Sequence, residues 1–277
     1  LQKVYKNQIF NLSYSEGYNA PTTATSIGTA TSQNAVNNNL LPEIAKMWDF
    51  SVHGLIAKTR FDYQLSLFSI NVKNKLSQSP GLDSSNNKYS YWSNTGNQQN
   101  RGFELSLGYV YDNLGFLRSI KPFINYSYYD FKYKDFETLK PGSKTETTNY
   151  IGKQVVGVPK TKYTVGLDFE TDFGLYLINT YSYLGDVYSD FSNSNLVKGF
   201  GLLNSKIGYK KSFGKWNADV FLAGNNLTNQ TNYTFLFLGN SVDDSDVGSN
   251  FPGQKTDINP GYHKAWFQYG FSLKYNF

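Results

Sequence analysis

The chain has 277 residues, of which 17% are aromatic and 17% charged, with 23 Tyr, 21 Phe and no Cys. It holds no apolar run near the roughly 20 residues that a membrane helix needs, which excludes helical spans, whereas a mean hydropathy of −0.48 is compatible with a membrane barrel whose strands are only half apolar. The 26 Lys and Arg outnumber the 21 Asp and Glu, but they are spread along the chain without a basic cluster, so nucleic acid is not an expected partner.

Segments in which apolar or aromatic residues take every second position recur from one end of the chain to the other. In an extended strand this alternation puts the apolar side chains on one face and the polar ones on the opposite face. The pattern predicts about ten strands, at 8–15, 48–54, 61–67, 103–111, 122–129, 161–170, 175–183, 201–210, 215–226 and 265–277.

The predicted connections alternate in length. The short ones are tight turns near 57–60, 112–117, 171–174 and 211–215. The long ones are rich in Ser, Asn, Gly and Asp and lie near 16–43, 73–98, 132–158, 186–199 and 231–262. Short connections on one rim and long ones on the other are typical of an outer-membrane barrel, whereas a sandwich mixes loop lengths at both ends. A soluble sheet would need a second layer over its apolar face, and no segment is left to supply one. The predicted fold is therefore all-β, a transmembrane antiparallel β-barrel.

The last predicted strand, 265–277, shows the alternation most clearly, with Phe271, Tyr275 and Phe277 among its apolar positions. Tyr suits a site that is apolar along the ring and wet at the hydroxyl, as at a membrane interface. We expect this face to meet lipid, with Tyr275 and Phe277 in the lower aromatic girdle. The strand edge has to pair with the first strand of the complete barrel, because unpaired backbone groups are costly in lipid.

Several charged residues have the opposite parity and are expected to face a polar lumen, since a charge on the lipid face costs about 2–4 kcal/mol at mid-depth. They are Glu104, Asp168, Glu170, Lys206 and Lys274. Arg101 has the outward parity near the outer rim, where anionic lipid headgroups are a partner, unless a local bulge turns it inward.

Ligand-binding candidates lie at strand exits and in the long loops. Tyr18 and Asn19 stand where the first strand leaves the membrane, so they either face a ligand vestibule or simply form a strand exit. Tyr89, Tyr91 and Trp92 are rings able to stack on a siderophore, a sugar or haem, or they belong to the interface girdle. Both alternatives stay open for each group.

Metal and catalytic patterns are weak. Asp243, Asp244 and Asp246 cluster in one loop but lack the full calcium-loop pattern, which favours a solvated acidic loop. The two histidines, His53 and His263, stand too far apart in sequence for a convincing metal or haem pair. A protease barrel would need a His-Asp pair and further carboxylates at the rim, and no spacing demands this. We therefore predict neither a cofactor nor an enzyme.

Five motifs occur in order along the chain. They are SEGYNAPT at 15–22, LPE at 41–43, NRGFELSLGY at 100–109, AGNNLTNQTNY at 223–233 and the terminal Phe277. Their ordered combination resembles the barrel half of a TonB-dependent outer-membrane receptor. The resemblance implies that residues 1–277 form the last ten strands of a twenty-two-stranded barrel, with a plug domain and about twelve strands outside this sequence.

The resemblance also implies a function. It predicts uptake of a scarce nutrient, first of all a ferric siderophore, across the outer membrane of a Gram-negative bacterium, energised by TonB through the plug. The implied partners are outer-membrane lipid and lipopolysaccharide, the barrel-assembly machinery that reads the strand ending in Phe277, and the plug, which Glu104 would contact. The alternative is a self-contained ten-stranded barrel acting as a protease, an adhesin or a scaffold.

Overall fold

The computed structural model describes residues 1–22, 39–56, 60–82, 85–86, 88–139, 143, 145–237, 257–261 and 264–276. Within these ranges the regular elements are strands, and their pairings are antiparallel. No helix of the described residues is long and apolar enough to cross a membrane.

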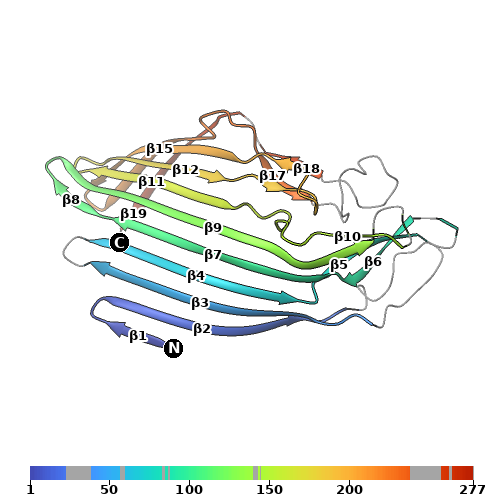
Figure 1. Ribbon diagram of the computed structural model, residues 1–277. Coiled ribbons are helices and arrows are strands. Elements are labelled where there is room, and N and C mark those ends of the chain that lie inside the picture. Colours follow the sequence, from blue (N-terminus) through green and yellow to red (C-terminus); the bar gives the residue numbers. More distant parts are fainter. Residues whose placement is uncertain are drawn as a thin grey trace.

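A sheet of 13 strands forms a curved wall, with β8 (Tyr111–Leu114) and β10 (Thr147–Asn149) pairing only with β9 (Figure 1). Neighbours along the main path follow one another in sequence apart from the short strands between them. The path runs through β1 (Gln2–Tyr5), β2 (Gln8–Asn19), β3 (Glu43–Ile56), β4 (Phe61–Lys73), β7 (Gly96–Tyr109), β9 (Leu117–Leu139), β11 (Thr161–Thr171), β12 (Leu175–Leu184), β15 (Phe200–Phe213), β16 (Trp216–Asn225) and β19 (Trp266–Tyr275).

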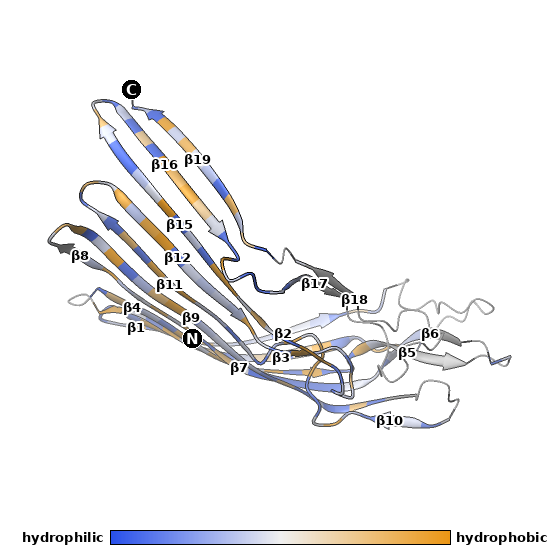
Figure 2. Cartoon of the chain, turned by 90° about the horizontal axis from the view of Figure 1, so that it is seen from above, coloured by the Kyte–Doolittle hydropathy of each residue, from blue (hydrophilic) through white to orange (hydrophobic). Residues whose placement is uncertain are grey.

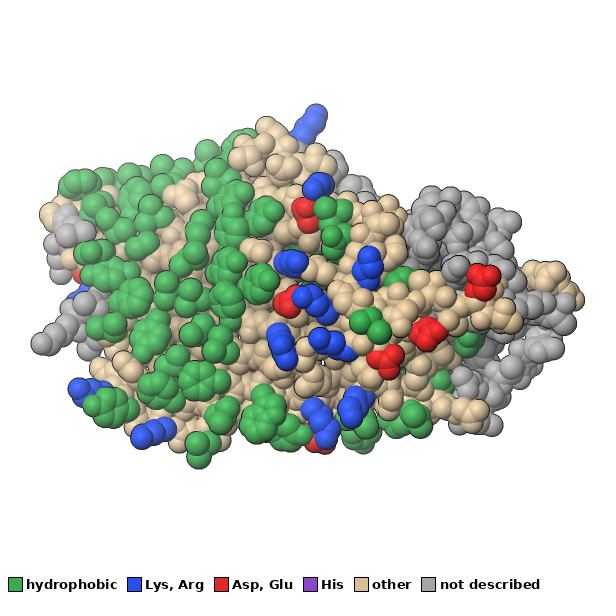
Figure 3. Space-filling model, viewed as in Figure 1, with side chains coloured by type: hydrophobic (Ala, Val, Ile, Leu, Met, Phe, Trp, Pro, Cys, Tyr) green, Lys and Arg blue, Asp and Glu red, His purple; other side chains and the backbone are tan. Residues whose placement is uncertain are grey.

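The wall curls so that β2, β4 and β9 face the viewer in Figure 1 while β19 lies behind them. The same view in Figure 3 shows the convex face, and most of its area over the strands is covered by hydrophobic side chains. Along individual strands, polar and apolar residues alternate (Figure 2). The sheet thus has a convex apolar face and a concave polar face, which confirms the predicted alternation.

Strand register aligns the predicted apolar stripes from end to end of the wall. Leu67 lies opposite Phe103, Leu105 opposite Tyr126, and Val220 opposite Phe271. The aromatic members contact across strands, with ring centroids 5.1 Å apart for Tyr163 and Tyr183 and 4.9 Å apart for Trp216 and Tyr275. Such pairs contribute roughly 0.2–1 kcal/mol each and fix the register.

Tight turns join the strands at one end of the wall. Gly115, Gly174 and Gly214 have positive φ angles of 66°, 104° and 62° and lie in three of the four predicted turns. A side chain at Gly174 would collide with the carbonyl oxygen of Lys210, so glycine is required there for steric as well as conformational reasons. The fourth predicted turn, 57–60, lies mostly outside the described residues.

The opposite end carries more structure than the sequence predicts. β7 begins at Gly96 and β9 ends at Leu139, well beyond the predicted segments 103–111 and 122–129. The extra residues of β7 are polar on both faces, so its alternation disappears although the ladder of hydrogen bonds with β9 continues. Three short hairpins and the first strand of the wall were also not predicted. The hairpins are β5 (Leu76–Leu82) with β6 (Lys88–Asn94), β13 (Val187–Tyr188) with β14 (Leu196–Val197), and β17 (Tyr233–Phe237) with β18 (Asp257–Pro260).

Candidate functional site

The five predicted lumen charges all lie on the concave face. Their cross-strand neighbours are mainly polar or small, and the register pairs Glu104 with Ser66 and Ser127, Asp168 with Lys121 and Ile178, Glu170 with Ser119 and Tyr176, Lys206 with Ile178 and Ala223, and Lys274 with Asn217. This face can therefore hold water, a polar ligand or another polar domain, which the convex face cannot.

An aromatic patch lies on the concave face towards the loop end of the wall. Its rings are Phe68, Tyr129 and Phe131, with centroids 5.4 to 6.1 Å apart. Gly102 lies between Phe68 and Tyr129 in the register, and a Cβ there would meet the Phe68 ring at 2.7 Å and also the carbonyl oxygen of Tyr128. The Tyr129 hydroxyl donates a 2.8 Å hydrogen bond to Glu104. In the segment Asn100–Glu104, Gly102 is thus required by the close approach of the Phe68 ring, and Glu104 accepts the hydrogen bond of Tyr129.

A second polar cluster lies on the concave face near the tight turns. Arg118 pairs with Glu170 at 3.2 Å, and the Tyr176 hydroxyl donates to Asp219 at 2.9 Å. Lys206 Nζ lies 3.8 Å from the Phe221 ring centroid, a cation–π contact. An open hollow of about 700 Å³ is lined by Arg118, Glu170 and Asp219 of this cluster together with Lys274. Because the hollow is lined by both acidic and basic side chains, it suits water or a polar binding partner better than an apolar one.

Tyr18 and Asn19 point to opposite faces. Tyr18 lies opposite Ile44 and shares its parity with Phe10, Leu12 and Tyr14 on the convex side, where it is 80% exposed. Asn19 has the concave parity. The register therefore argues against a vestibule position for Tyr18, and only for Asn19 does the ligand assignment stay a prediction.

The aromatic segment with Tyr89, Tyr91 and Trp92 forms β6 of the β5–β6 hairpin. This hairpin is a separate two-stranded sheet that lies beyond the loop end of β4 and β7 (Figures 1 and 2). Tyr91 and Trp92 are half-buried, and their positions alternate between the two faces of the hairpin; the Tyr89 side chain lies outside the described part. Tyr91 and Trp92 therefore lie outside the strands of the wall, and a role of this segment in ligand binding remains a prediction.

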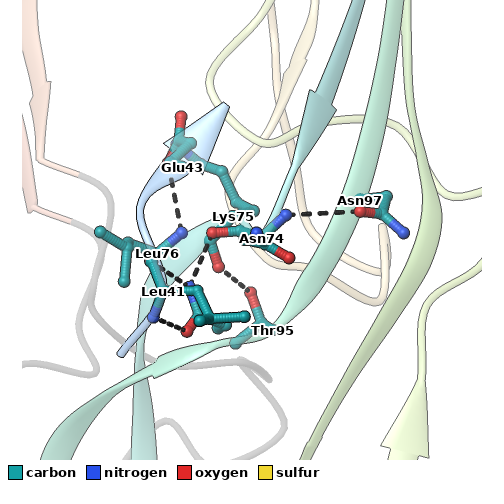
Figure 4. Close-up of polar contacts among 8 residues, drawn as sticks. Leu41, Glu43, Asn74, Lys75, Leu76, Thr95 and Asn97 are labelled. Atoms are coloured by element: carbon teal, nitrogen blue, oxygen red, sulfur yellow. Dashed lines mark hydrogen bonds and ion pairs between the residues drawn. The ribbon is translucent and has the colours of Figure 1, made fainter. Parts of the chain in front are cut away.

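Glu43 fastens the base of this hairpin to the wall, as Figure 4 shows. Its carboxylate pairs with Lys75 Nζ at 3.1 Å and accepts a hydrogen bond from the Leu76 N–H at 3.2 Å. Asn94 completes the anchor because its amide bonds both backbone groups of Leu41 and the carbonyl oxygen of Asn74. Sequence reasoning noticed the LPE motif at 41–43 but did not assign it this clamp. The partners lie 20 to 53 residues apart in the chain, which no local pattern reveals.

Two loops pack together at the same end. Tyr133, Phe136 and Tyr150 form a buried cluster, and Phe191 from the β12–β15 connection packs against it with centroids 4.9 Å from Phe136. Phe136 has no exposed surface. This cluster joins the β9–β11 connection to the β12–β15 connection, so the two loops form one surface.

The β12–β15 connection is shaped by two aspartates. Burial alone would raise the pKa of Asp190, but hydrogen bonds from the Ser192 hydroxyl, the Asn195 and Ser194 N–H groups and the Ser194 hydroxyl outweigh it and hold the pKa below its ordinary value. The Gly199 N–H and the Lys198 ammonium lower the pKa of Asp186. Both carboxylates are therefore structural acceptors of the loop.

The remaining predicted sites divide between described and masked residues. Among the described residues there is no group of three or more His, Cys, Asp or Glu placed to hold a metal ion. His53 has the concave parity on β3, opposite Gln64. Phe271 and Tyr275 lie on the convex side of β19, where they are 69% and 37% exposed. Asp243, Asp244, Asp246, His263 and Phe277 lie outside the described residues.

A curved antiparallel wall with an apolar convex face, a polar concave face, tight turns at one end and long structured loops at the other is typical of part of an outer-membrane β-barrel. Residues 4–227 match the family model for the TonB dependent receptor-like β-barrel, and the chain belongs to this family of Gram-negative outer-membrane transport receptors. A search of curated proteins by sequence found no match.

Solved structures of the same fold include receptors for iron chelates and a copper transporter. BauA, the ferric preacinetobactin receptor of Acinetobacter baumannii, is 20% identical with a TM-score of 0.64, over 99% of this chain and 35% of its own. PiuA, a siderophore receptor of the same species, is 17% identical with a TM-score of 0.67, over 98% and 34%. The copper transporter OprC is 14% identical with a TM-score of 0.64, over 98% and 38%. The chain thus spans about a third of the length of these proteins.

Proposed function

We propose that this chain is the C-terminal barrel wall of an outer-membrane receptor that takes up a ferric siderophore and is energised by TonB through a plug domain outside this sequence. The observation that carries the proposal is the family match together with near-complete alignment of this chain to about one third of siderophore receptors such as BauA and PiuA.

The wall supplies three things to such a receptor. Its convex apolar face seals the barrel against lipid, so that no backbone group meets hydrocarbon unpaired. Its concave face offers aromatic rings and mixed charges to a large polar ligand and to a plug. The hairpin clamped by Glu43 and Asn94 holds the Tyr91 and Trp92 rings at the loop end, on the side from which a ligand would enter.

The cargo has to be tested directly, because OprC has the same wall architecture and its name gives copper as its cargo. The receptor containing this chain is expressed in a host that lacks its own siderophore receptors, under iron limitation. Uptake of ⁵⁵Fe is measured for a panel of hydroxamate, catecholate and carboxylate complexes, with uptake of copper measured in parallel.

The proposal predicts ⁵⁵Fe accumulation from at least one complex, its loss when TonB is deleted, and a reduced rate after Tyr91→Ala with Trp92→Ala. A control substitution at the opposite end, Lys215→Gln, leaves the rate unchanged. Copper accumulation without iron uptake, or iron uptake that persists without TonB, contradicts it.

A further inference from the structure

Aromatic rings lie over glycines between several neighbouring strands of the wall. A Cβ placed at such a glycine would come within 3.0 Å of a ring atom on the next strand, so the ring fills the space that a side chain would need. On the concave face these ring–glycine contacts join direct cross-strand partners, which are Phe68 and Gly102, Phe123 and Gly166, Tyr176 and Gly208, and Phe221 and Gly270.

The concave ring–glycine contacts all lie between strands that a long connection joins. These strand pairs are β4 with β7, β9 with β11, β12 with β15, and β16 with β19, and each time the ring stands on the earlier strand and the glycine on the later one. The last two pairs have a further contact on the convex face, Tyr181 over Gly201 and Phe267 over Gly224. The arrangement is therefore a repeated feature of the wall.

The remaining strand pairs differ. Across the tight turn between β3 and β4, the hydroxyl of Tyr63 rather than its ring approaches Gly54, at 3.0 Å from a Cβ placed there. In β2, whose long connection leads to β3, Gly17 has open space around it. Ring–glycine contacts thus accompany four of the five long connections, and the tight turns do without them.

The apolar alternation leaves one ambiguity in the register of paired strands. A slip by one residue turns every side chain to the wrong face, but a slip by two residues leaves both faces as they were. A tight turn excludes the second slip because its length fixes the pairing. A long connection does not, since even a doubling of loop length lowers the probability of closure only about three-fold.

The ring–glycine contacts distinguish the native register from this two-residue slip. Phe123 lies over Gly166, and a slip in either direction would put it opposite Thr164 or Asp168 instead. The slipped partners at the other contacts would be Asn100 or Glu104 for Phe68, Lys206 or Lys210 for Tyr176, and Gln268 or Ser272 for Phe221. Each of these residues has a side chain in the space that the ring occupies, and such overpacking is destabilising.

We propose that the ring–glycine contacts select the register of the strand pairs that long connections join, while the barrel assembles. The wall then reaches one register although its outward connections do not prescribe it, so these connections can change in length and sequence without displacing the strands. This inference goes beyond the proposed function and holds for any cargo.

Cysteine pairs on the concave face can read the register of β9 against β11. Ser127→Cys with Lys162→Cys are direct partners in the native register. Ser127→Cys with Thr164→Cys, and Asn125→Cys with Lys162→Cys, become direct partners only after a two-residue slip in one direction or the other. Direct partners are close enough for a disulfide, whereas positions two residues further along are too far apart.

The test uses the full receptor that contains this chain, oxidised briefly in cells while it assembles. Peptide mass spectrometry counts native and slipped links in all chains, so a variant that fails to fold still gives a ratio. Phe123→Ala removes the ring and Phe123→Tyr keeps one. The control Phe103→Ala removes a ring of the same size, which stacks on Tyr126 and Tyr128 across the turn between β7 and β9.

Phe123→Ala is expected to raise the ratio of slipped to native links about 2- to 10-fold. Phe123→Tyr and Phe103→Ala should keep the wild-type ratio. An unchanged ratio in Phe123→Ala overturns the proposal. An equal rise in Phe103→Ala overturns it as well, because the ring of Phe123 would then add stability without selecting the register.

Discussion

Replacing Glu43 by Ala should loosen the β5–β6 hairpin without unfolding the wall. The substitution removes the ion pair between Glu43 and Lys75, whose side chains are 16% and 33% exposed, respectively. It also leaves the Leu76 N–H without its acceptor. A partly buried ion pair together with one charge-assisted hydrogen bond contributes about 1–2 kcal/mol. Because 1.4 kcal/mol is a factor of ten, the opening equilibrium of the hairpin base should rise roughly 5- to 30-fold.

Native-state hydrogen exchange measures this opening directly. The reporting amides are Lys75, which donates to Gly96, and Thr95, which donates to Lys75, at 2.7 and 2.8 Å. Their exchange should accelerate by the same 5- to 30-fold, while amides of β11 and β12 keep their rates. Glu43→Gln keeps an acceptor but loses the charge, so its exchange rates at Lys75 and Thr95 should lie between those of wild type and Glu43→Ala.

The matched control is Glu16→Ala, which removes an exposed glutamate that also pairs with a lysine, Lys46. It should leave exchange at Lys75 and Thr95 unchanged. Unchanged exchange at these amides in Glu43→Ala would refute the clamp, and equal acceleration throughout the wall would show that the hairpin is not a separate opening unit.

Four further predictions concern the wall and its loops. Gly102→Ala should destabilise the barrel by about 1–3 kcal/mol in urea unfolding, because a Cβ there meets the Phe68 ring and a backbone oxygen. Gly17→Ala, with open space around it, should be neutral. Equal effects of the two substitutions would contradict the close packing of Phe68 against Gly102. Phe271→Arg should cost about 2–4 kcal/mol in lipid vesicles, and Gln268→Arg on the concave face much less; the reverse order would contradict the assignment of faces. The pKa values of Asp190 and Asp186 lie below their unfolded values, so the stability that these carboxylates give the loop is complete above about pH 4 and is lost as pH falls through their folded pKa values. Opening of the loop at 190–195, measured by hydrogen exchange, should therefore increase only in that acidic range. Asp190→Asn should remove the part of this pH dependence that Asp190 contributes. Removing Phe277 should impair membrane insertion, read as loss of the heat-modifiable gel shift, and a normal shift would count against it.

The strands of the wall were predictable because the alternation that marks them depends only on residues close together in sequence. Alternation such as Phe103, Leu105 and Leu107 against Glu104 and Ser106 needs only the period of a strand, and the register then brings every such stripe to one face. The tight turns were predictable because they are the short gaps between consecutive alternating segments, and Gly115, Gly174 and Gly214 lie in three of them.

The loop end was not predictable in the same way. At the start of β7 both faces of the strand are polar, so residues such as Asn97 and Gln98 carry no periodic signal although they pair with β9. The Glu43 clamp and the Phe136–Phe191 contact join segments that are distant in sequence, and only the folded wall brings them together. For Tyr18 the sequence left a ligand vestibule and a simple strand exit open, and strand parity, which puts the ring on the convex side, favours the strand exit.

Site-specific labelling tests the central claim, that one face of this wall meets lipid and the other meets water. The chain has no Cys, so each single Cys substitution adds one thiol to this wall, and the receptor without the substitution measures the background labelling. Neighbouring positions on the same strand are compared in outer-membrane vesicles: Leu105→Cys with Ser106→Cys on β7, and Val165→Cys with Thr164→Cys on β11. The account predicts that a charged, water-soluble thiol reagent labels only the Ser106 and Thr164 variants, and that a probe on the Leu105 and Val165 variants is quenched by lipid-bound spin labels. Equal labelling of both members of each pair would contradict it.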